Sequence, residues 1–376
     1  MMRRGLYLCV LLFIGSCQQS PALPDDLQPP ADPLTIFQET GQTGGDAGIK
    51  TRMIFSDDAI PGEMNDNFSS FHLKQGYMAT FAENNDGSGF GFTYIAQTSD
   101  ILRDLPSRLA NKVSFIRVLP VREVLKKGVG NTKNELIDSL NVSWFYDWGP
   151  LDRSTAEREY VMMAWGRGAA KNSDKVDALI EMDSVTHLLS FNEPDNRSQS
   201  NIPYAEAANL HKLLLRTGYR IGSPAPEEGH ANKWLLDFMN EVNRDTIKVD
   251  FIALHWYDWG NWSSAHNPSP DPAKVFNRFK NYLNKMYNLY KKPIWITEFN
   301  ANRNRTPETH ARFMELALPW LDAQPFIERY AYFFPPGAPA IENGRITGAG
   351  KVYRDHVSRP SIAGNVIYVE EQKTAE

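Results

Sequence analysis

Eight short β-type runs alternate with longer stretches of helical pattern over most of this chain, from Lys127 to Phe334. Strands that alternate with helices form a parallel sheet with crossover connections. Eight such runs predict an α/β fold, a (β/α)8 TIM barrel over residues 123–365. The β runs are Lys127–Gly130, Val142–Tyr146, Tyr160–Trp165, His187–Asn192, Arg220–Pro224, Asp250–Tyr257, Pro293–Glu298 and Arg329–Phe334. The helical stretches are 173–182, 204–217, 231–242, 272–290 and 307–321.

The segment before this alternation has a different pattern. Residues 76–81, 92–96 and 113–118 have the features of short strands, and residues 86–89 those of a glycine turn. Such strands predict a small β-rich domain over residues 68–122. We expect an accessory unit that packs on the larger domain or assists ligand binding.

Part of this β-rich domain, from Tyr77 to Val118, resembles one Greek-key motif of the βγ-crystallin family. Members of that family usually bind calcium through two Asn or Asp residues followed by Ser-Ser. This chain has Ala110-Asn111 and Ser114-Phe115 at the matching positions. The resemblance therefore does not extend to a calcium site.

The first residues predict a secretory signal, because a charged start is followed by an apolar stretch from Leu6 to Ile14. Ile14-Gly15-Ser16-Cys17 also resembles a bacterial lipobox, in which the cysteine becomes the lipidated first residue of the mature chain. The resemblance implies a lipoprotein signal peptide over residues 1–17 and a membrane contact through a lipid anchor on Cys17. The alternative is an ordinary signal peptide with an incidental cysteine.

A lipid anchor implies a place in the bacterial cell envelope, at the outer-membrane surface or in the periplasm. The chain after Cys17 is rich in Pro, Asp, Gln and Gly, which predicts a flexible linker over residues 18–67. Residues 366–376 are expected to be a C-terminal tail. A formal net charge of −5 gives no basic footprint for nucleic acid, and we expect a monomer that binds a neutral polymer.

Two glutamates each stand at the end of a β run. Glu193 follows Phe191-Asn192, at the end of the fourth run, and Glu298 follows Ile296-Thr297, at the end of the seventh. Sites on a (β/α)8 barrel lie at the C-terminal ends of its strands, and a retaining glycosidase needs two carboxyl groups there. We expect Glu193 to be the general acid and base, with a proton affinity raised by the neighbouring negative charge. Glu298 is the expected nucleophile.

Other polar residues near these strand ends are candidates for the same site. Asn192 is placed to bind a substrate hydroxyl next to the reacting carbon. His255 and Tyr257 lie two residues apart and so point to the same side of their strand, where the Tyr hydroxyl can orient the nucleophile. The sequence has no metal-ligand spacing, phosphate loop or Gly-x-Ser-x-Gly elbow, so neither a metal nor a cofactor is expected.

Aromatic residues supply the candidates for substrate stacking. Trp144, Tyr146 and Trp148 alternate near the end of the second run, and Trp256, Trp259 and Trp262 cluster after the sixth. Some of these residues will pack in the core, because alternate side chains of a barrel strand point in opposite directions. The others are expected to form subsites along a cleft, which favours an endo-acting enzyme.

An ordered set of motifs resembles glycoside hydrolase family 128. The motifs are 142–150, 159–166, Phe191-Asn192-Glu193-Pro194-Asp195, His255-Trp256-Tyr257 and 294–299. Members of that family are retaining β-1,3-glucanases on a (β/α)8 barrel, and the resemblance covers about Lys126 to Pro335. By it, Glu193 matches the acid/base and Glu298 the nucleophile. Asp147 departs from the usual Asn, which puts the preference of the local subsite in doubt, and the preceding β segment lies outside the family pattern.

The leading hypothesis is hydrolysis of β-1,3-glucan of the laminarin type by double displacement. A second hypothesis keeps the mechanism and changes the substrate to another β-linked polysaccharide. A third is a non-catalytic, glycan-binding surface lipoprotein, which the presence of both glutamates disfavours.

Overall fold

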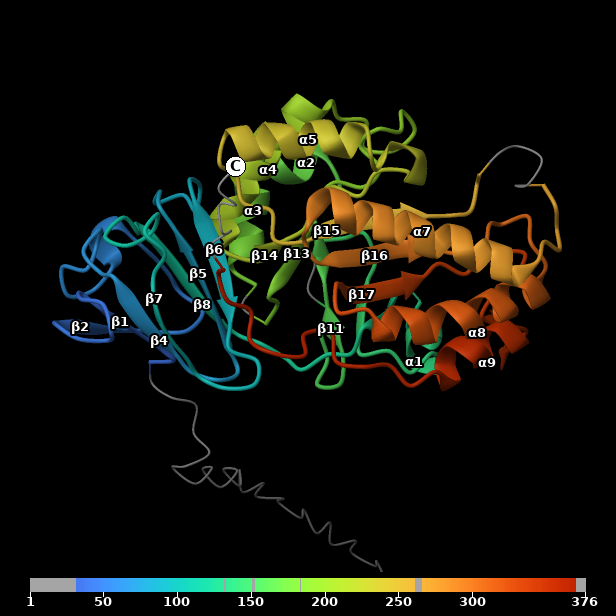
Figure 1. The fold of residues 1–376 in the computed structure, drawn as a ribbon, viewed down its shortest axis with the longest axis horizontal. Coiled ribbons are helices and arrows are strands. Elements are labelled where there is room, and N and C mark those ends of the chain that lie inside the picture. The colour runs from blue at the N-terminus through green and yellow to red at the C-terminus, as the bar shows by residue number, and fades with distance from the viewer. Residues whose placement is uncertain (1–31, 132, 151–152, 183, 261–265, 370–376) are drawn as a thin grey trace, which may run out of the picture. The chain divides into compact units, whose positions relative to one another are not determined.

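The structure is a computed structural model that describes residues 32–131, 133–150, 153–182, 184–260 and 266–369 (Figure 1). The predicted signal peptide, Cys17 and the first part of the predicted linker lie outside these residues. Among the described residues, no helix has both the length and the apolar composition needed to cross a membrane.

The N-terminal part of the described chain forms two antiparallel sheets of four strands, blue to teal in Figure 1. Their apolar faces share one core, in which Leu34, Phe71, Phe81, Tyr94 and Ile116 are buried. One sheet has the order β2-β1-β4-β7, with β1 Leu34–Phe37, β2 Asp46–Ile49, β4 Ser70–Leu73 and β7 Ile101–Asp104. The other has the order β3-β8-β5-β6, with β3 Ile54–Ser56, β5 Tyr77–Ala82, β6 Gly91–Ile95 and β8 Phe115–Pro120.

The prediction of a flexible linker over 18–67 is wrong for its described part, residues 32–67. Strands β1, β2 and β3 lie there, and Leu34 and Ile36 are fully buried. The predicted tail over 366–376 is also wrong where it is described, because Val366 pairs with Ile95 and Tyr368 packs on the β core. These strands are too short and too rich in turn residues to stand out locally, and their apolar side chains acquire partners only in the folded sheet.

The rest of the chain is a mixed α/β unit with parallel strands, and each of the eight predicted β runs contains a strand. A six-stranded sheet has the order β11-β10-β9-β17-β16-β15, and a three-stranded sheet the order β12-β13-β14. The two sheets are not joined into a closed one, so the predicted complete barrel is not confirmed. The strands are β9 Lys127–Gly130, β10 Trp144–Tyr146, β11 Glu159–Tyr160, β12 Met162–Met163, β13 His187–Leu189, β14 Arg220–Ile221, β15 Ile252–Trp256, β16 Ile294–Phe299 and β17 Ile327–Tyr332.

All five predicted helical stretches contain a helix: α3 Ser173–Ile180, α4 Tyr204–Leu214, α5 Trp234–Arg244, α7 Pro272–Tyr290 and α8 Pro307–Ala323. Both α7 and α8 begin with proline after a capping residue, since Asp271 accepts from the N–H of Ala273 and Thr306 from that of Thr309. Not predicted are α1 Asn134–Ser139, α2 Arg167–Ala170 and α9 Gly348–Asp355, the 3-10 turns η2 Asp57–Ala59, η3 Leu215–Thr217 and η4 Glu228–His230, and the hairpin β18 Ile341–Glu342 and β19 Arg345–Ile346.

A second, smaller core lies among the parallel strands and supports the candidate site. It contains Trp144, Tyr146, Phe251 and Trp295, all fully buried, and the rings of Phe251 and Trp295 stack at 4.1 Å. Buried ion pairs adjoin it, because Trp295 Nε1 donates to Glu328, which binds Arg220 at 2.6 Å. Such paired and hydrogen-bonded charges fix the strands relative to one another.

The antiparallel sheets contact the α/β unit through buried hydrogen bonds. Thr80 Oγ1 donates to the carbonyl of Gly218 at 2.8 Å, and Lys248 Nζ donates to Thr93 Oγ1 at 3.0 Å. The antiparallel unit is therefore packed on the larger one, as one of the two expectations from the sequence had it.

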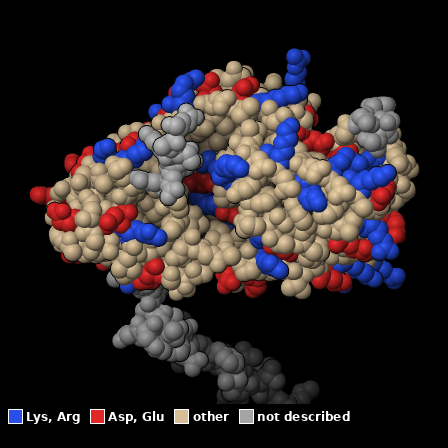
Figure 2. All heavy atoms as spheres, viewed as in Figure 1, with Lys and Arg blue, Asp and Glu red and all other residues tan. Residues whose placement is uncertain are grey.

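On the face shown in Figure 2, side chains of both charges are interspersed.

Candidate active site

The two candidate glutamates lie at the carboxyl ends of parallel strands. Glu298 is the penultimate residue of β16, and Glu193 follows Asn192, which forms a parallel bridge with Ala225. Glu193 has a φ of 38°, in the left-handed region that is uncommon for a residue other than glycine, and its N–H donates to the Ala225 carbonyl at 2.8 Å. The bridge thus holds Glu193 in a strained conformation of the kind that clusters at functional sites.

The two carboxylates and the ring of His255 are close neighbours. One carboxylate oxygen of Glu193, one of Glu298 and one ring nitrogen of His255 all lie within 4.8 Å of one another. Carboxyl groups of retaining glycosidases are about 5 to 5.5 Å apart, whereas those of inverting enzymes are about 6.5 to 9.5 Å apart. The separation therefore matches the retaining arrangement.

His255 lies between the two glutamates and is fully buried. Its Nδ1 is 3.1 Å from Glu193 Oε1, and its Nε2 is 3.7 Å from Glu298 Oε1. Burial acts to lower the pKa of His255, but the charge of Glu298 and the hydrogen bond to Glu193 outweigh burial and raise the pKa above its ordinary value. The site therefore favours a cationic imidazolium between two carboxylates.

The same contact overturns the prediction that the proton affinity of Glu193 is raised. Burial does act to raise the pKa of Glu193, but the hydrogen bond and charge of His255, together with a hydrogen bond from Asn196, bring the pKa below its usual value. The prediction considered only the neighbouring negative charge, because the sequence does not show that His255 lies between the two glutamates.

Two donors orient the carboxylate of Glu298. The hydroxyl of Tyr257 donates to Oε2 and Trp148 Nε1 donates to Oε1 at 3.0 Å, whereas the hydroxyl of Tyr146 donates to the neighbouring Thr297 carbonyl at 2.9 Å and lies 3.4 Å from Oε1. Burial, followed by the charge of Glu298, raises the pKa of both tyrosines well above its ordinary value, so the hydroxyls stay protonated as donors. The structure thus brings Tyr257 to the place that the sequence predicted for it.

Asn192 offers a buried acceptor beside Glu193. Its side-chain N–H donates to Gln199 Oε1 at 3.3 Å, whereas its Oδ1 has no hydrogen-bond partner among the described residues. Buried polar atoms normally have a partner. The Oδ1 of Asn192 is therefore a buried acceptor that the described protein groups leave unpaired.

The prediction that Trp144 and Trp256 bind substrate is wrong. Trp144 is fully buried, and its Nε1 donates to the Lys126 carbonyl at 3.0 Å. Trp256 is 4% exposed and packs on Phe279 of α7 and Phe313 of α8. Because adjacent strand residues point to opposite faces, an inward His255 requires an outward Trp256.

The remaining aromatic candidates have different positions. Tyr146 is fully buried and therefore positions Glu298 rather than contacting a ligand. Trp148 is partly exposed and remains a candidate for substrate binding, as does Trp259. Trp262 lies outside the described residues.

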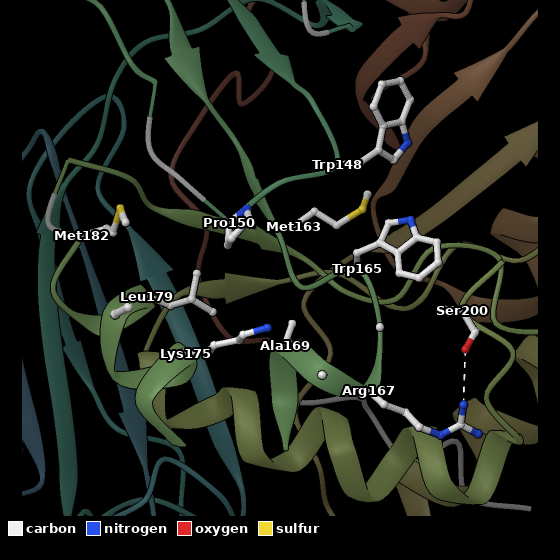
Figure 3. A pocket seen from close by; sticks show the side chains of 13 residues that line it. Trp148, Pro150, Met163, Trp165, Arg167, Ala169, Lys175, Leu179, Met182 and Ser200 are labelled. Carbon is white, nitrogen blue, oxygen red and sulfur yellow. Dashed lines mark hydrogen bonds between the residues drawn. The ribbon is translucent and has the colours of Figure 1, made fainter. Parts of the chain in front are cut away.

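Two cavities adjoin the glutamates: Trp148, which donates to Glu298, lines one, and Glu193 itself lines the other. One, of about 620 Å³, is lined by Trp148 and Trp165, whose indole rings lie on one side of it, while Leu179 and Met182 lie on the other (Figure 3). The other, of about 650 Å³, is lined by Glu193 and by residues from several loops: Glu227, Glu228, Gly229, His230, Tyr257, Trp259, Gly260, Asn300, Arg303, Phe333, Pro335 and Pro336. Trp148 contacts Glu298 and Phe333, so it connects the two cavities.

Sequence reasoning missed several residues of this cleft. Trp165 ends the third predicted run and Phe333 nearly ends the eighth, so the strand-end rule that selected the glutamates would also have selected both. Asn196 and Glu227 lie in loops without a local signal. Asp147, the departure from the family pattern, accepts hydrogen bonds from Arg153 at 2.5 Å and from the hydroxyl of Tyr160, so it stabilises its own loop.

Comparison with known proteins identifies the larger unit. Residues 126–353 match the family model of the glycosyl hydrolase catalytic core. The chain belongs to this family. The glycosyl hydrolase has no match among the curated proteins. Solved structures of glycoside hydrolase family 128 (GH128) resemble it, and the chain is a member of that family.

Three of these structures show how far the likeness extends. A subgroup I endo-β-1,3-glucanase from Amycolatopsis mediterranei, in complex with laminaritriose, is 29% identical to the glycosyl hydrolase, with a TM-score of 0.54 over 61% of this chain and 99% of that one. A subgroup III curdlan-specific exo-β-1,3-glucanase from Blastomyces gilchristii, in complex with glucose, is also 29% identical, with a TM-score of 0.50 over 61% and 97%. A subgroup II endo-β-1,3-glucanase from Sorangium cellulosum is 23% identical, with a TM-score of 0.51 over 62% and 99%, and supports the fold alone.

Proposed function

We propose that this GH128 protein hydrolyses internal bonds of β-1,3-glucan by double displacement, with retention of configuration at the anomeric carbon. The observation that carries the proposal is the approach of Glu193 and Glu298 to within 4.8 Å, with the donors Tyr257 and Trp148 on Glu298. The activities of the GH128 endo-β-1,3-glucanases support the choice of reaction and polymer.

In the first step, a carboxylate oxygen of Glu298 attacks the anomeric carbon of the sugar. The bond from that carbon to the glycosidic oxygen breaks, and Glu193 gives its proton to the leaving oxygen. Tyr257 and Trp148 hold the attacking carboxylate in place, which removes much of the entropic cost of reaching the transition state. The product is a glycosyl ester of Glu298 and a released glucan end.

In the second step, Glu193 accepts a proton from water as the water oxygen attacks the anomeric carbon. The ester bond to Glu298 breaks, the sugar is released with its original configuration, and both carboxyl groups return to their starting states. His255 assists the change of role. Once Glu298 is esterified its negative charge is gone, so the imidazolium acts on Glu193 alone and favours the ionised form that serves as base.

The shape of the cleft supports endo action. Two cavities adjoin the catalytic pair, one lined by Trp148 and one by Glu193, and together they offer room for several sugar units, as an endo enzyme requires. Trp148 and Trp165 offer aromatic faces for sugar rings in one cavity, and Trp259 does so in the other. The free Oδ1 of Asn192 can accept a hydrogen bond from a sugar hydroxyl beside the reacting carbon.

We also infer that the two parallel sheets are parts of one (β/α)8 barrel. Only Val161 separates β11 from β12, and an isolated parallel bridge between Gly222 and Phe251 links β14 to β15. The first strand of the unit, β9, pairs with the last, β17. With these links Glu193 follows the fourth strand and Glu298 ends the seventh.

We also propose that the two antiparallel sheets form a Greek-key unit. Of the first four strands, β3 pairs in the sheet β3-β8-β5-β6, and of the next four, β7 pairs in the sheet β2-β1-β4-β7. This exchange of one strand between two four-strand motifs supports a Greek-key unit of the βγ-crystallin kind. The lipid anchor on Cys17 and a place in the bacterial cell envelope concern residues outside those described. We further propose that the protein is a monomer and does not bind nucleic acid.

Hydrolysis of laminarin by matched variants tests the proposed function. Glu193→Gln and Glu298→Gln should each lower the release of reducing ends by about two to four orders of magnitude, because each removes one half of the acid/base and nucleophile pair. Glu308→Gln, the same exchange on the exposed surface of α8, should leave the rate unchanged. Oligosaccharides of mixed length are the expected early products. Tight binding without hydrolysis by the parent protein would contradict the proposal.

A further inference from the structure

Three side chains beside the catalytic pair have no part in the proposed reaction. They are Asp195, which follows Glu193 and Pro194, and Glu227 and His230, which lie on the turn around η4. One ligand atom from each lies within 4.8 Å of the other two. The set combines two carboxylates with an imidazole, and all three come from loops that follow parallel strands.

The contact between Asp195 and His230 is not an ordinary hydrogen bond. Asp195 Oδ2 is 2.7 Å from His230 Nδ1, yet both atoms are buried and neither has a hydrogen-bond partner among the described residues. The side chain of Asp195 is only 3% exposed, and its other oxygen accepts from the N–H of Glu227 at 3.2 Å. Two ligand atoms at about 2.1 Å from one tetrahedral zinc ion stand roughly 3.4 Å apart, so the two side chains would separate slightly to admit an ion. The observation that points to a ligand is that both buried atoms face each other without a hydrogen bond.

The charge of the cluster also favours a cation. Among the described residues, neither a lysine nor an arginine forms an ion pair with this cluster, and His230 is the only basic side chain paired with Asp195. One oxygen of Asp195 and one of Glu227 lie within 4.8 Å of each other, so the two carboxylates repel each other. A bound cation would relieve this repulsion and satisfy the buried oxygen.

We propose that Asp195, Glu227 and His230 bind one divalent transition-metal ion, for which Zn²⁺ is the best fit. Imidazole with carboxylates is a ligand set that zinc accepts, and three protein ligands leave a fourth position open. Glu227 and His230 line the cavity of about 650 Å³ that also contains Glu193, so this position is accessible from the cleft. The inference goes beyond the proposed hydrolysis and does not depend on it. The sequence expectation of no metal was based on local spacing, which does not show ligands from separate loops.

The ion would also be coupled to the acid/base residue. Asn196 Nδ2 donates to Glu227 Oε1 at 2.8 Å and lies 3.4 Å from Glu193 Oε2. A metal that draws Glu227 toward Asp195 and His230 competes for the carboxylate that Asn196 now contacts. The same amide is then available to Glu193 alone.

Calorimetric titration of the full chain with zinc chloride tests the site, after bound metal has been removed with a chelator. We expect one Zn²⁺ per chain with a dissociation constant in the micromolar range or below. His230→Ala and Asp195→Asn should each weaken binding at least tenfold. His72→Ala is the matched control, because His72 forms a hydrogen bond with Asp100 at 2.6 Å in a pair that Lys74 completes. It should bind zinc like the parent.

Further measurements keep the result unambiguous. Thermal unfolding shows whether each variant is folded. If His230→Ala is unfolded, the zinc affinity of Asp195→Asn, which keeps the shape of the side chain, decides whether the site binds the ion. Glu298→Gln should retain zinc binding. Loss of binding in Glu298→Gln with retention in His230→Ala would place the ion at the catalytic pair and overturn the proposal. Absence of binding by the parent would overturn it as well. Neither result bears on laminarin hydrolysis, which is measured separately.

Discussion

His255 is the residue through which the two glutamates influence each other. Its ring is buried between them, with Nδ1 3.1 Å from Glu193 and Nε2 3.7 Å from Glu298. The hydrogen bond and charge of His255 lower the pKa of Glu193 against the opposing effect of burial. The proton balance of the site therefore depends on a residue that does not touch the reacting bond.

Replacement of His255 by glutamine should move the basic limb of the pH profile of kcat/KM to higher pH. The limb reports loss of the proton from Glu193, and without the imidazolium burial, which raises the pKa of that carboxyl, is opposed only by the weaker effect of the Asn196 hydrogen bond. We expect kcat to fall about tenfold to a hundredfold, because the two carboxylates also lose the imidazole that fixes their positions relative to each other. His310→Gln, at a buried histidine hydrogen-bonded to Tyr332, is the control and should leave the limb in place. An unchanged or lowered limb in His255→Gln would contradict this role.

At the scale of single residues, the sequence predicted which side chains lie at the ends of strands, but it did not predict how deeply a side chain is buried. Glu193, Glu298 and Tyr257 lie in the site because residues at the carboxyl ends of parallel strands meet at the same edge of the sheet. The failure at Trp256 was avoidable, since its neighbour His255 points the other way. The burial of Trp144 was not, because the sequence does not say how far down a strand a side chain lies.

At the level of elements, the long helices and the hydrophobic strands were predictable and the short ones were not. The helices α7 and α8 have a capping residue, a proline at the first turn and a periodic apolar face. In contrast, α2 has four residues and β1 four, and such lengths carry too little periodicity to identify. Tertiary contacts decide these segments, as Leu34 and Ile36 show in the N-terminal sheet.

The pairing of β9 with β10 requires glycine at position 128. Trp144 lies opposite Gly128, and a Cβ there would be 2.1 Å from the indole ring. Gly128→Ala should therefore lower the free energy of unfolding by about 1 to 3 kcal/mol, through a shift of Trp144 or of the strand. Gly168→Ala in α2 is the control, because a Cβ there meets nothing within 4 Å. It should be neutral or stabilising in denaturant unfolding. Equal losses in both variants would contradict the argument.

At the scale of the whole molecule, the antiparallel sheets and the α/β unit share buried polar contacts. Thr80, in β5, bonds both Thr93 Oγ1 at 2.9 Å and the Gly218 carbonyl at 2.8 Å. Separation of the two units would expose these groups and leave Lys248 without one of its partners. The β unit thus contributes to the stability of the catalytic unit, whatever further role it has.

Differential scanning calorimetry of the full chain should show one cooperative unfolding transition. Thr80→Val should shift that whole transition to lower temperature, by a loss of about 1 to 3 kcal/mol, because the carbonyl of Gly218 loses its donor in a buried place. The exposed exchange Thr43→Val, at a hydroxyl bonded only within its own turn, serves as the control. Two separate transitions, with only one affected by Thr80→Val, would show that the units unfold independently.

The central claim is that Glu298 attacks the sugar while Glu193 handles the proton. Mass spectrometry after reaction with an activated 2-fluoro derivative of a β-1,3-linked disaccharide tests it most directly, because fluorine slows release of the covalent intermediate. We predict an increase in mass of one glycosyl group per chain, on the peptide that contains Glu298, and no adduct in Glu298→Gln. Hydrolysis that proceeds without any adduct, or an adduct on Glu193, would contradict the claim.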